Sequence, residues 1–559
     1  KNVKKKTLLT ERDVLKTVIN AHQKNVYRFI LKGWKRSKFD GEGLKVTIET
    51  RLGTITGLER RSKDGNLYYA FTRIPYAKPP IGELRFKNPV ELEPWKGSLD
   101  ATQTIPKCLQ LLRTNRDNNE NLATTGQEDC LYLNIYTPKL PSSESKLAVL
   151  VYIHGGGFKY GSMGSEQGAD YFMDENIILV TLHYRINILG FLSTEDTTIP
   201  GNFGLKDQAM ALKWLYKNVD IFGGDPEKLT IFGGSAGAVS THYHMISPLS
   251  KNLIKGAISQ SGAVNKLWGF AQPGVTRHFA TDVAQRLGCA NQQDIELLKC
   301  LQQVPAEKLV SASQVYVNRF VNVTIIFRPT REPVAEGAFL TSDPMTEVTT
   351  LPWITGVNTH DGLLIFGSPA LQNDSATETF IEKIDEVLPQ LLSLNESSSD
   401  FSSLISAIKD KYFKKPITIQ SARNGLLEVY RDYYFNYQMS SAIARHKGPL
   451  FQYYYDYRGA NSHLDVFGNN SYGAAHGDEL ISLLNWEKRF PKYQSEDVKV
   501  SKNLVKMWAN FAKTQKPSLE DVIWPDGKQN AEYMHITQTF TVERNFDAEI
   551  ISWWTKLNL

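Results

Sequence analysis

The sequence predicts an α/β fold with a large, mostly parallel central sheet and helices on both faces. Short apolar, β-branched runs at 147–154, 177–182 and 229–232 alternate with helical patterns at 207–218 and 238–246. This alternation of strands and helices is typical of parallel sheets. With 41% hydrophobic and 22% charged residues, the 559-residue chain has the composition of a folded globular protein. Its apolar runs are too short to cross a bilayer, so we expect no transmembrane helix.

The N-terminal stretch differs chemically from the rest. Residues 1–39 hold twelve Lys or Arg and two acids, a net charge of +10, whereas the whole chain carries +5. Apolar residues between Val14 and Ile30 follow helical spacing. We therefore expect residues 1–43 to form a basic amphipathic helical extension and residues 44–559 to form one large domain. Residues 1–39 can contact an anionic membrane or, as we favour, lie against the protein body. No recognised nucleic-acid module accompanies them, so we expect no nucleic-acid partner.

The next segments combine strand patterns with turns. Residues 46–50 and 52–57 alternate as in antiparallel strands joined by glycine turns. Residues 71–86 contain three prolines, which favours a rigid covering loop over a regular strand or helix. Residues 128–138 are predicted to be a strand that ends at a proline, and residues 147–154 a fully buried one.

A run of glycines, Gly155-Gly156-Gly157, follows the buried strand at once. Consecutive glycines leave backbone N–H groups free of side-chain crowding, so they can point at one oxyanion. We expect Gly156 and Gly157 to donate such hydrogen bonds, with Ala236 as the third donor. The alternative is a glycine turn that merely lets the strand bend, and the position of the run before the next motif favours the donor role.

The pentapeptide Gly233–Gly237 matches the pattern G-x-S-x-G, in which a serine sits on a sharp turn between a strand and a helix. The predicted strand at 229–232 and helix at 238–246 flank it as this pattern requires. The helix places its positive end near the hydroxyl, which suits a nucleophile that attacks a carbonyl. Ser235 is therefore the predicted nucleophile. Beyond Gly262 we expect mainly helices, with polar stretches such as 393–403 and with neither repeats nor linkers.

The cysteines and sequons indicate an oxidising compartment. Four cysteines in two locally spaced pairs suggest two short disulfide loops, each worth on the order of 3 kcal/mol, although three pairings are open from the sequence. Four Asn-x-Ser/Thr sequons point the same way, so we expect a secreted glycoprotein. The cysteines are Cys108, Cys130, Cys289 and Cys300, and the sequons begin at Asn322, Asn373, Asn395 and Asn469.

Together these motifs resemble the carboxylesterase/cholinesterase family, and within it the insect carboxylesterases. The resemblance covers the chain from about Val46 to its end and implies an α/β-hydrolase fold. It also supports the pairs Cys108–Cys130 and Cys289–Cys300. The matching segments are Ile74-Pro-Tyr-Ala-Lys-Pro-Pro80, Glu128-Asp-Cys-Leu-Tyr-Leu-Asn134, His154-Gly-Gly-Gly-Phe158, Gly201-Asn-Phe-Gly-Leu-Lys-Asp-Gln208, Gly233–Gly237, Ser259-Gln-Ser-Gly262 and His476-Gly-Asp-Glu-Leu480.

The resemblance also assigns the groups that spacing alone leaves open among eleven histidines and many acids. His476 matches the family's base and Asp361 its acid, in the chain order serine, acid, histidine. The family more often has glutamate at the acid position. Because aspartate is one methylene shorter, either the loop lies closer or the hydrogen bond is longer.

Further positions are carried over from the resemblance. Ser261 matches a serine that supports the histidine in relatives, and Trp268 an aromatic residue that lines the acyl pocket; both can equally be core residues. Arg73 replaces a small glycine, which puts the local loop in doubt. Gly234 replaces the acidic or amide residue that usually precedes the nucleophile, so we expect a lower pKa at His476 and a preference for neutral, apolar esters over choline esters.

The resemblance implies a serine carboxylesterase that works through an acyl-enzyme, with ester substrates and with organophosphate and carbamate inhibitors. No metal or cofactor is expected, because fixed N–H dipoles polarise the carbonyl. A hormone- or pheromone-specific esterase remains an alternative within this class. A non-catalytic adhesion protein on the same fold is the rival from another class, but such relatives lack the serine or the histidine. The oligomeric state is left open.

Overall fold

The computed structural model describes the backbone of residues 34–37 and describes residues 44–557 except 96, 113–122, 141–145, 164–167, 290–293, 314–324, 366–367, 395–399, 468–471, 487–491 and 529. The helix expected between Val14 and Ile30 lies outside these residues. Trp34–Ser37, within the stretch expected to be helical, instead form strand β1, which pairs antiparallel with β2 (Lys45–Thr50). This pairing satisfies backbone groups that β2 would otherwise leave open at its edge.

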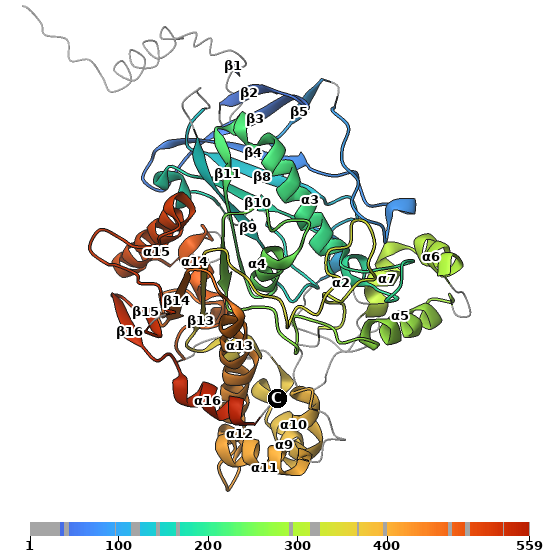
Figure 1. Cartoon of the computed structure of the whole chain (residues 1–559), viewed down its shortest axis with the longest axis vertical. Helices are drawn as coiled ribbons and strands as arrows, with labels where there is room; N and C mark the ends of the chain where they lie inside the picture. Colours follow the sequence, from blue (N-terminus) through green and yellow to red (C-terminus); the bar gives the residue numbers. More distant parts are fainter. Residues whose placement is uncertain are drawn as a thin grey trace, which may run out of the picture.

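A mixed sheet runs through the molecule in the order β1-β2-β3-β4-β8-β10-β9-β11-β12-β13-β14-β15-β16 (Figure 1). Strands from β10 to β15 along this order pair in parallel, whereas β1 to β4, β8 and β16 pair antiparallel at the two ends. The strands are β3 (Gly53–Arg61), β4 (Leu67–Pro75), β5 (Ser98–Asp100), β6 (Gln110–Leu111), β7 (Thr124–Thr125), β8 (Tyr132–Thr137), β9 (Leu147–Ile153), β10 (Ile178–Leu182), β11 (Gly224–Gly234), β12 (Gly256–Gln260), β13 (Trp353–Asn358), β14 (Leu450–Tyr455), β15 (Glu532–Ile536) and β16 (Phe540–Arg544).

Helices cover both faces of the sheet, as the sequence predicts. Residues Val149 and Val151 of β9 pack into the core that holds α3 and α4, whereas Leu150 and Tyr152 pack on the opposite face into the core that holds α15. This alternation follows from the two-residue repeat of a strand. The helices are α2 (Asn187–Phe191), α3 (Phe203–Asn218), α4 (Ala236–Ile246), α5 (Val275–Arg286), α6 (Asp294–Gln303), α7 (Ala306–Ala312), α8 (Pro369–Gln372), α9 (Asp374–Glu382), α10 (Ile384–Leu391), α11 (Phe401–Tyr412), α12 (Ile419–Val429), α13 (Gln438–Arg445), α14 (Asp478–Leu483), α15 (Ser495–Thr514) and α16 (Ala548–Lys556).

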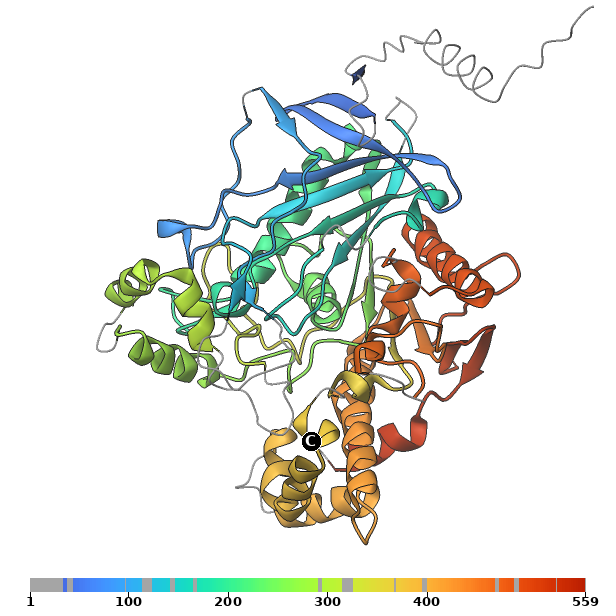
Figure 2. The same cartoon turned by 180° about the vertical axis from the view of Figure 1, so that it is seen from behind.

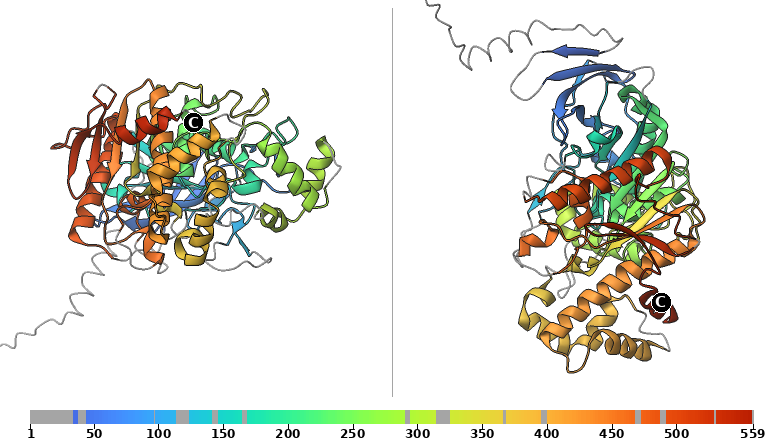
Figure 3. Two further views of the ribbon diagram at one scale, coloured as in Figure 1. Left: turned by 90° about the horizontal axis from the view of Figure 1, so that it is seen from below. Right: turned by 90° about the vertical axis from the view of Figure 1, so that its left-hand side faces the viewer.

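Short 3₁₀ and π segments complete the chain. The 3₁₀ segments are η1 (Gly82–Leu84), η2 (Phe172–Glu175), η3 (Val219–Phe222), η5 (Asp361–Ile365) and η7 (His463–Phe467), and η6 (Tyr430–Tyr437) is a π-helix. Seen from behind, the N-terminal strands lie at one end of the molecule and helices α9 to α12 form a lobe at the other (Figure 2). The same separation is visible from the side (Figure 3).

The prediction of a covering loop over 71–86 is wrong for its first part. Strand β4 continues to Pro75, with an irregularity in its pairing to β8 between Phe71 and Ile74. Proline is tolerated because it stands at the last position of the strand. Arg73 lies within the irregularity at φ 59°, a conformation that favours glycine, and its N–H donates to Asn134 Oδ1 at 3.0 Å.

The prediction of mainly helices beyond Gly262 missed four strands, β13 to β16. Strands β13, β14 and β15 extend the parallel part of the sheet, and β16 closes it antiparallel. They are five or six residues long, and helical insertions separate β13 from β14 and β14 from β15, so no continuous alternation marks them. Their position matters because β13 carries the chain to Asp361.

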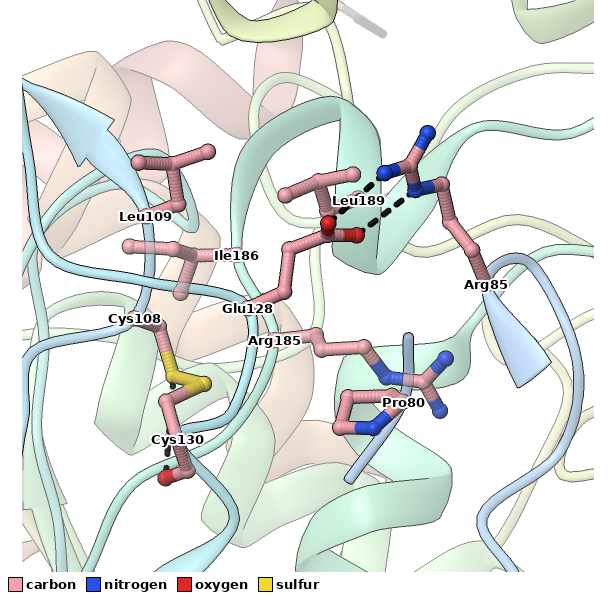
Figure 4. Close-up of a pocket in the computed structure, with 9 residues that line it drawn as sticks. All are labelled: Pro80, Arg85, Cys108, Leu109, Glu128, Cys130, Arg185, Ile186 and Leu189. Atoms are coloured by element: carbon pink, nitrogen blue, oxygen red, sulfur yellow. Dashed lines mark hydrogen bonds and ion pairs between the residues drawn. A yellow bond between two sulfur atoms is a disulfide. The ribbon is translucent and has the colours of Figure 1, made fainter. Parts of the chain in front are cut away.

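Both disulfides join the expected pairs, Cys108–Cys130 and Cys289–Cys300. The first lies beside a buried ion pair in which Arg85 holds both carboxylate oxygens of Glu128, at 2.6 and 2.7 Å (Figure 4). Arg85 also donates to the carbonyls of Gln302 and Val304 at the end of α6. These contacts tie the segment before β8 to the end of α6, the helix that carries Cys300. None of the described helices is long and apolar enough to cross a membrane.

Candidate active site

Ser235 stands between the end of β11 at Gly234 and the start of α4 at Ala236. Its backbone has φ 58° and ψ −123°, outside the regions that residues with side chains prefer, which costs on the order of 1–3 kcal/mol. A Cβ added at Gly233 would lie 2.4 Å from the carbonyl oxygen of Ile153, and one at Gly237 only 2.1 Å from the same atom. Only glycine fits at these two positions, which explains the pattern G-x-S-x-G.

Two backbone hydrogen bonds fix this turn. The Ser235 N–H donates to the carbonyl of Gln260 at 2.8 Å, and the Ser235 carbonyl accepts from the N–H of Val239 at 3.0 Å. The first bond continues the pairing of β11 with β12, and the second begins α4. The serine is therefore held from both sides by regular structure.

The glycine loop packs directly against the turn. A Cβ at Gly155 would meet the carbonyl oxygen of Gly234 at 2.5 Å, and one at Gly156 (φ 110°) the carbonyl oxygen of Tyr160 at 1.9 Å. The N–H groups of Gly156 and Gly157 donate to none of the described residues. Both glycines line the same cavity as Ser235, so their N–H groups are available to a ligand there.

His476 and Asp361 are joined across 115 positions of sequence. His476 Nδ1 lies 2.7 Å from Asp361 Oδ1, and the aspartate is fully buried. The shorter side chain thus still makes a hydrogen bond of ordinary length. The other ring nitrogen, Nε2, is buried and has no partner among the described residues. His476 and Ser235 line the same cavity.

Hydrogen bonds from residues at and just after the end of β13 hold Asp361 and the loop of His476 in place. Asp361 Oδ2 accepts from the N–H of Asn358 at 2.9 Å, at the carboxyl end of β13. The side-chain amide of Asn358 donates to the carbonyl of Ala475 at 2.7 Å, next to His476. His360 N–H donates to the carbonyl of Ala474 at 3.0 Å. The end of β13 thus leads to Asp361 and is hydrogen bonded to the loop that carries His476.

The charges around His476 favour its protonated form. Burial lowers its pKa, but the hydrogen bond and charge of Asp361, with the charges of Glu479 and Asp478, outweigh burial and raise the pKa above its ordinary value. A histidine held this way by a carboxylate accepts a proton readily.

Glu479 is a residue of this site that the sequence analysis missed. It is buried, lines the cavity, and accepts hydrogen bonds from the side-chain amides of Gln260 and Asn358. Burial raises its pKa to about 7, with the charge of Asp361 adding to the effect. The expectation of a lower His476 pKa, based on Gly234, did not take the nearby charge of Glu479 into account. Glu479 is part of the motif His476–Leu480, so its position three residues after His476 could have identified it.

The cavity has a volume of about 730 Å³, and part of its lining is aromatic and apolar. Trp268 and Phe435 have ring centroids 6.1 Å apart, and Phe435 lies 4.9 Å from the ring of His476. Trp268 donates its indole N–H to the carbonyl of Tyr434 at 3.2 Å. Ser261 also lines the cavity, at φ 53°, and its buried hydroxyl has no partner among the described residues. Tyr434 and Phe435 lie on η6 and carried no sequence signal.

Of the four sequons, Asn373 alone falls within the described residues. It is exposed, and its side-chain oxygen accepts from the N–H of Ala376 as the N-cap of α9. Its amide nitrogen, the atom that carries a glycan, takes no part in this cap. Asn322, Asn395 and Asn469 lie outside the described part of the chain.

Comparisons with known proteins agree with this geometry. The family model described as "Carboxylesterase family" matches residues 44–554. The juvenile hormone esterase of Tribolium castaneum is 34% identical, with 92% of this chain and 94% of that protein covered. Esterase FE4 of Myzus persicae is also 34% identical, with 90% of each chain covered. The crystal structure of juvenile hormone esterase from Manduca sexta with OTFP covalently attached has a TM-score of 0.80 at 29% identity and covers 92% of this chain and 99% of that one.

The match to the family model extends over most of the chain, and the relatives align over nearly their whole length. The fold around the cavity is that of the structural neighbour, an α/β-hydrolase. The chain therefore belongs to the carboxylesterase family, and its reaction is the hydrolysis of carboxylic esters.

Proposed function

We propose that this protein hydrolyses neutral, apolar carboxylic esters through an acyl-enzyme on Ser235, with His476 as the base and Asp361 as the acid that orients it. The observation that carries this proposal is the 2.7 Å hydrogen bond between His476 and Asp361 in the cavity that also holds the strained serine. Hydroxyl, imidazole and carboxylate in this order can activate a serine at neutral pH.

In acylation, His476 Nε2 takes the proton from Ser235 Oγ while Oγ attacks the ester carbonyl carbon. The N–H groups of Gly156, Gly157 and Ala236 donate to the oxyanion that forms. Asp361 stabilises the imidazolium through Nδ1. The C–O bond to the alcohol then breaks, and the alkoxide leaves with the proton from His476.

Deacylation repeats these steps with water. His476 takes a proton from the water, whose oxygen attacks the acyl carbon of the Ser235 ester. Collapse of the second tetrahedral intermediate returns the proton to Ser235 and releases the carboxylic acid. Ser261 supports His476 from the adjoining wall, and Trp268 lines the space for the acyl group, with Phe435 beside it.

A dialkyl fluorophosphate tests the nucleophile directly. The serine oxygen displaces fluoride, so intact mass should rise by one dialkylphosphoryl group, and peptide mapping should place it on Ser235. The Ser235→Ala protein treated in parallel is the control and should gain no mass. Stoichiometric labelling of a different residue would refute the assignment.

Gly234 bears on the choice of substrate. Its backbone lies outside the left-handed region, and an added Cβ would come within 2.9 Å only of Leu480 Cδ1, the end of a flexible side chain. Gly234→Glu should therefore fold. The new carboxylate stabilises protonated His476, so the acid limb of the kcat/KM profile should move to higher pH. Relative kcat/KM for butyrylcholine over 3,3-dimethylbutyl butyrate should rise by about tenfold.

Gly234→Gln is the matched control, since it adds nearly the same volume without a charge. It should leave both the acid limb and the choline preference near the wild-type values. Equal shifts in the two variants would mean that bulk, not charge, acts at this position. A wild type that already prefers butyrylcholine to its neutral isostere would contradict the proposed substrate class.

A hormone ester is a second candidate substrate, because the Tribolium castaneum and Manduca sexta proteins are named juvenile hormone esterases. Competition between a juvenile hormone and a simple aryl butyrate would separate a specific esterase from a general one. A specific enzyme should give a much higher kcat/KM for the hormone.

We further propose that the protein is secreted and glycosylated. Two disulfides close within the described residues, and such bonds persist in oxidising compartments. Release of Asn-linked glycan from Asn373 by an amidase, read as a mass change, tests both parts together.

A further inference from the structure

The glycine loop folds back on itself at its far end. The carbonyl of Gly156 accepts a hydrogen bond from the N–H of Tyr160 at 3.1 Å. Gly161 then returns to the start of the loop, where a Cβ on it would lie only 2.5 Å from the carbonyl oxygen of Gly155. The backbone of Gly161 therefore packs against the residue that precedes the expected oxyanion donors.

The side chain of Gln110 holds Gly161 by a pair of hydrogen bonds. Gln110 Nε2 donates to the carbonyl of Gly161, and Gln110 Oε1 accepts from the N–H of Gly161, each at 3.0 Å. Nε2 also donates to the carbonyl of Cys108 at 2.9 Å. Gln110 lines the cavity and is 6% exposed. Because both amide hydrogens are used in these contacts, its side chain has no donor left for a substrate.

Gln110 is itself anchored by a strand pair and a disulfide. It lies on β6, which pairs antiparallel with β7 through Gln110 and Thr125. Cys108, whose carbonyl accepts from Gln110, is bonded to Cys130, two residues before β8. The first disulfide thus fixes the backbone from which Gln110 reaches the glycine loop.

His183 joins the same two segments at a second point. Its Nδ1 donates to the carbonyl of Pro106 at 2.9 Å, and its Nε2 accepts from the N–H of Met163 at 2.7 Å. Burial, with the neighbouring His154 adding to the effect, lowers the pKa of His183 to about 3. The ring therefore stays neutral and keeps one donor and one acceptor throughout the neutral pH range.

The contact with Gly161 requires an amide of this length. A primary amide presents a donor and an acceptor side by side, which matches the carbonyl and the N–H of one backbone residue. A carboxylate only accepts, and an ammonium group only donates. The N–H groups of Gly156 and Gly157 have no such partner among the described residues, so their direction depends on how the loop is held. Hydrogen bonds to an oxyanion act at about 2.7–3.1 Å, so a small shift of the loop weakens them.

We propose that Gln110 is a positioning residue for the reaction, which holds Gly161 so that the N–H groups of Gly156 and Gly157 point at the oxyanion. This inference rests on the proposed function and deepens it. Gln110 acts through the loop and donates no hydrogen bond to the substrate. Its loss should weaken the binding of the oxyanion and leave the binding of an unreacted ligand unchanged.

Gln110→Met tests this role, because methionine has a similar length and volume but makes none of the three hydrogen bonds. kcat/KM for 4-nitrophenyl butyrate should fall by about 30-fold, less than the loss expected when an oxyanion donor is removed outright. Stoichiometric labelling with the fluorophosphate gives the concentration of active enzyme, so that misfolded protein does not enter these values.

Two inhibitors separate oxyanion binding from ligand binding in general. When 1,1,1-trifluorododecan-2-one binds, Ser235 Oγ adds to its carbonyl carbon, the proton passes to His476, and the carbonyl oxygen becomes the oxyanion of a hemiketal. Its Ki should rise in Gln110→Met by the same factor by which kcat/KM falls. The alcohol 1,1,1-trifluorododecan-2-ol has nearly the same shape but cannot add to the serine, so its Ki should stay unchanged.

Gln302→Met is the matched control. Gln302 Nε2 also donates to two backbone carbonyls, those of Glu83 and Arg85, both at 2.9 Å, and Gln302 is not among the described residues that line the cavity. This variant should keep kcat/KM and both Ki values near those of the wild type. Gln110→Asn retains the amide on a side chain one methylene shorter. It should show the same joint change as Gln110→Met, and it provides the test if that variant does not fold.

The outcomes separate this inference from the function on which it rests. If the wild type hydrolyses the ester and binds the ketone, and the Gln110 variants keep both values, the inference is wrong and the esterase proposal stands. A fall in kcat/KM with an unchanged Ki for the ketone would show a merely structural role and would also overturn it. If the wild type neither hydrolyses the ester nor forms the hemiketal, the proposed function fails and the role of Gln110 fails with it.

Discussion

Ser235→Ala is expected to lower kcat for 4-nitrophenyl butyrate by about 10⁶-fold. The hydroxyl is the only group of the proposed triad that bonds covalently to the substrate, so no acyl-enzyme can form without it. The change should not disturb the fold, because Ser235 is held through backbone hydrogen bonds to Gln260 and Val239. Steady-state kinetics on protein with an unchanged melting temperature provides the measurement.

Ser261→Ala tests whether this loss is specific to Ser235, since Ser261 also lines the cavity and its buried hydroxyl has no partner among the described residues. As a supporting residue it should cost far less, about tenfold or below, and leave fluorophosphate labelling intact. The reverse pattern, with labelling lost in Ser261→Ala and kept in Ser235→Ala, would exchange the two roles.

Asp361→Asn is expected to lower kcat by up to about 10⁴-fold. The carboxylate accepts two hydrogen bonds, from His476 Nδ1 at one oxygen and from the N–H of Asn358 at the other. An amide has a single oxygen. If that oxygen faces the fixed N–H of Asn358, the amide NH₂ faces Nδ1 and stabilises the tautomer whose Nε2 already carries a proton. That tautomer cannot accept the proton of Ser235.

Two companion variants distinguish the acid from its neighbours. Asp361→Glu keeps the charge and should retain more activity than Asp361→Asn, although the extra methylene must fit a fully buried site. Glu479→Gln keeps a hydrogen-bonding side chain and removes the rival carboxylate. A 10⁴-fold loss in Glu479→Gln beside near wild-type activity in Asp361→Asn would transfer the role to Glu479.

The parts of the site that the sequence predicts are those set by local steric demands. Gly233 and Gly237 flank the serine because a Cβ at either position would collide with the carbonyl oxygen of Ile153. A Cβ at Gly156 would likewise collide with the carbonyl oxygen of Tyr160. Such positions exclude every residue type except glycine. A short glycine motif in the sequence is therefore enough to predict the strand, turn and helix around it.

Other features depend on contacts between distant segments. The choice of His476 and Asp361 came from family resemblance, because nothing local distinguishes them from the other histidines and acids. Glu479 is buried next to them only because Asn358 at the end of β13 and Gln260 at the end of β12 reach it. Likewise, η6 brings Phe435 to the imidazole through tertiary packing.

Strand β4 shows a second reason why prediction from sequence falls short. The prolines that begin at Pro75 led to the prediction of a loop. A proline at the end of a strand removes only one backbone donor, however, so the strand can continue up to it. The late strands β13 to β15 pair in parallel with partners dozens of residues away in sequence. Their short apolar runs cannot be told from buried helical segments by periodicity.

The contact between Ile153 and the two glycines of the nucleophile turn links catalysis to the assembly of the sheet. Ile153 is the last residue of β9 and pairs with Gly233 of β11. The glycine loop begins two residues later, at Gly155. A shift of this parallel pair by one residue would turn the side chains of β11 to the opposite face and carry the serine away from the loop. Recovery of esterase activity during refolding therefore requires the correct register of β9 and β11, which spectroscopic measures of secondary structure do not report.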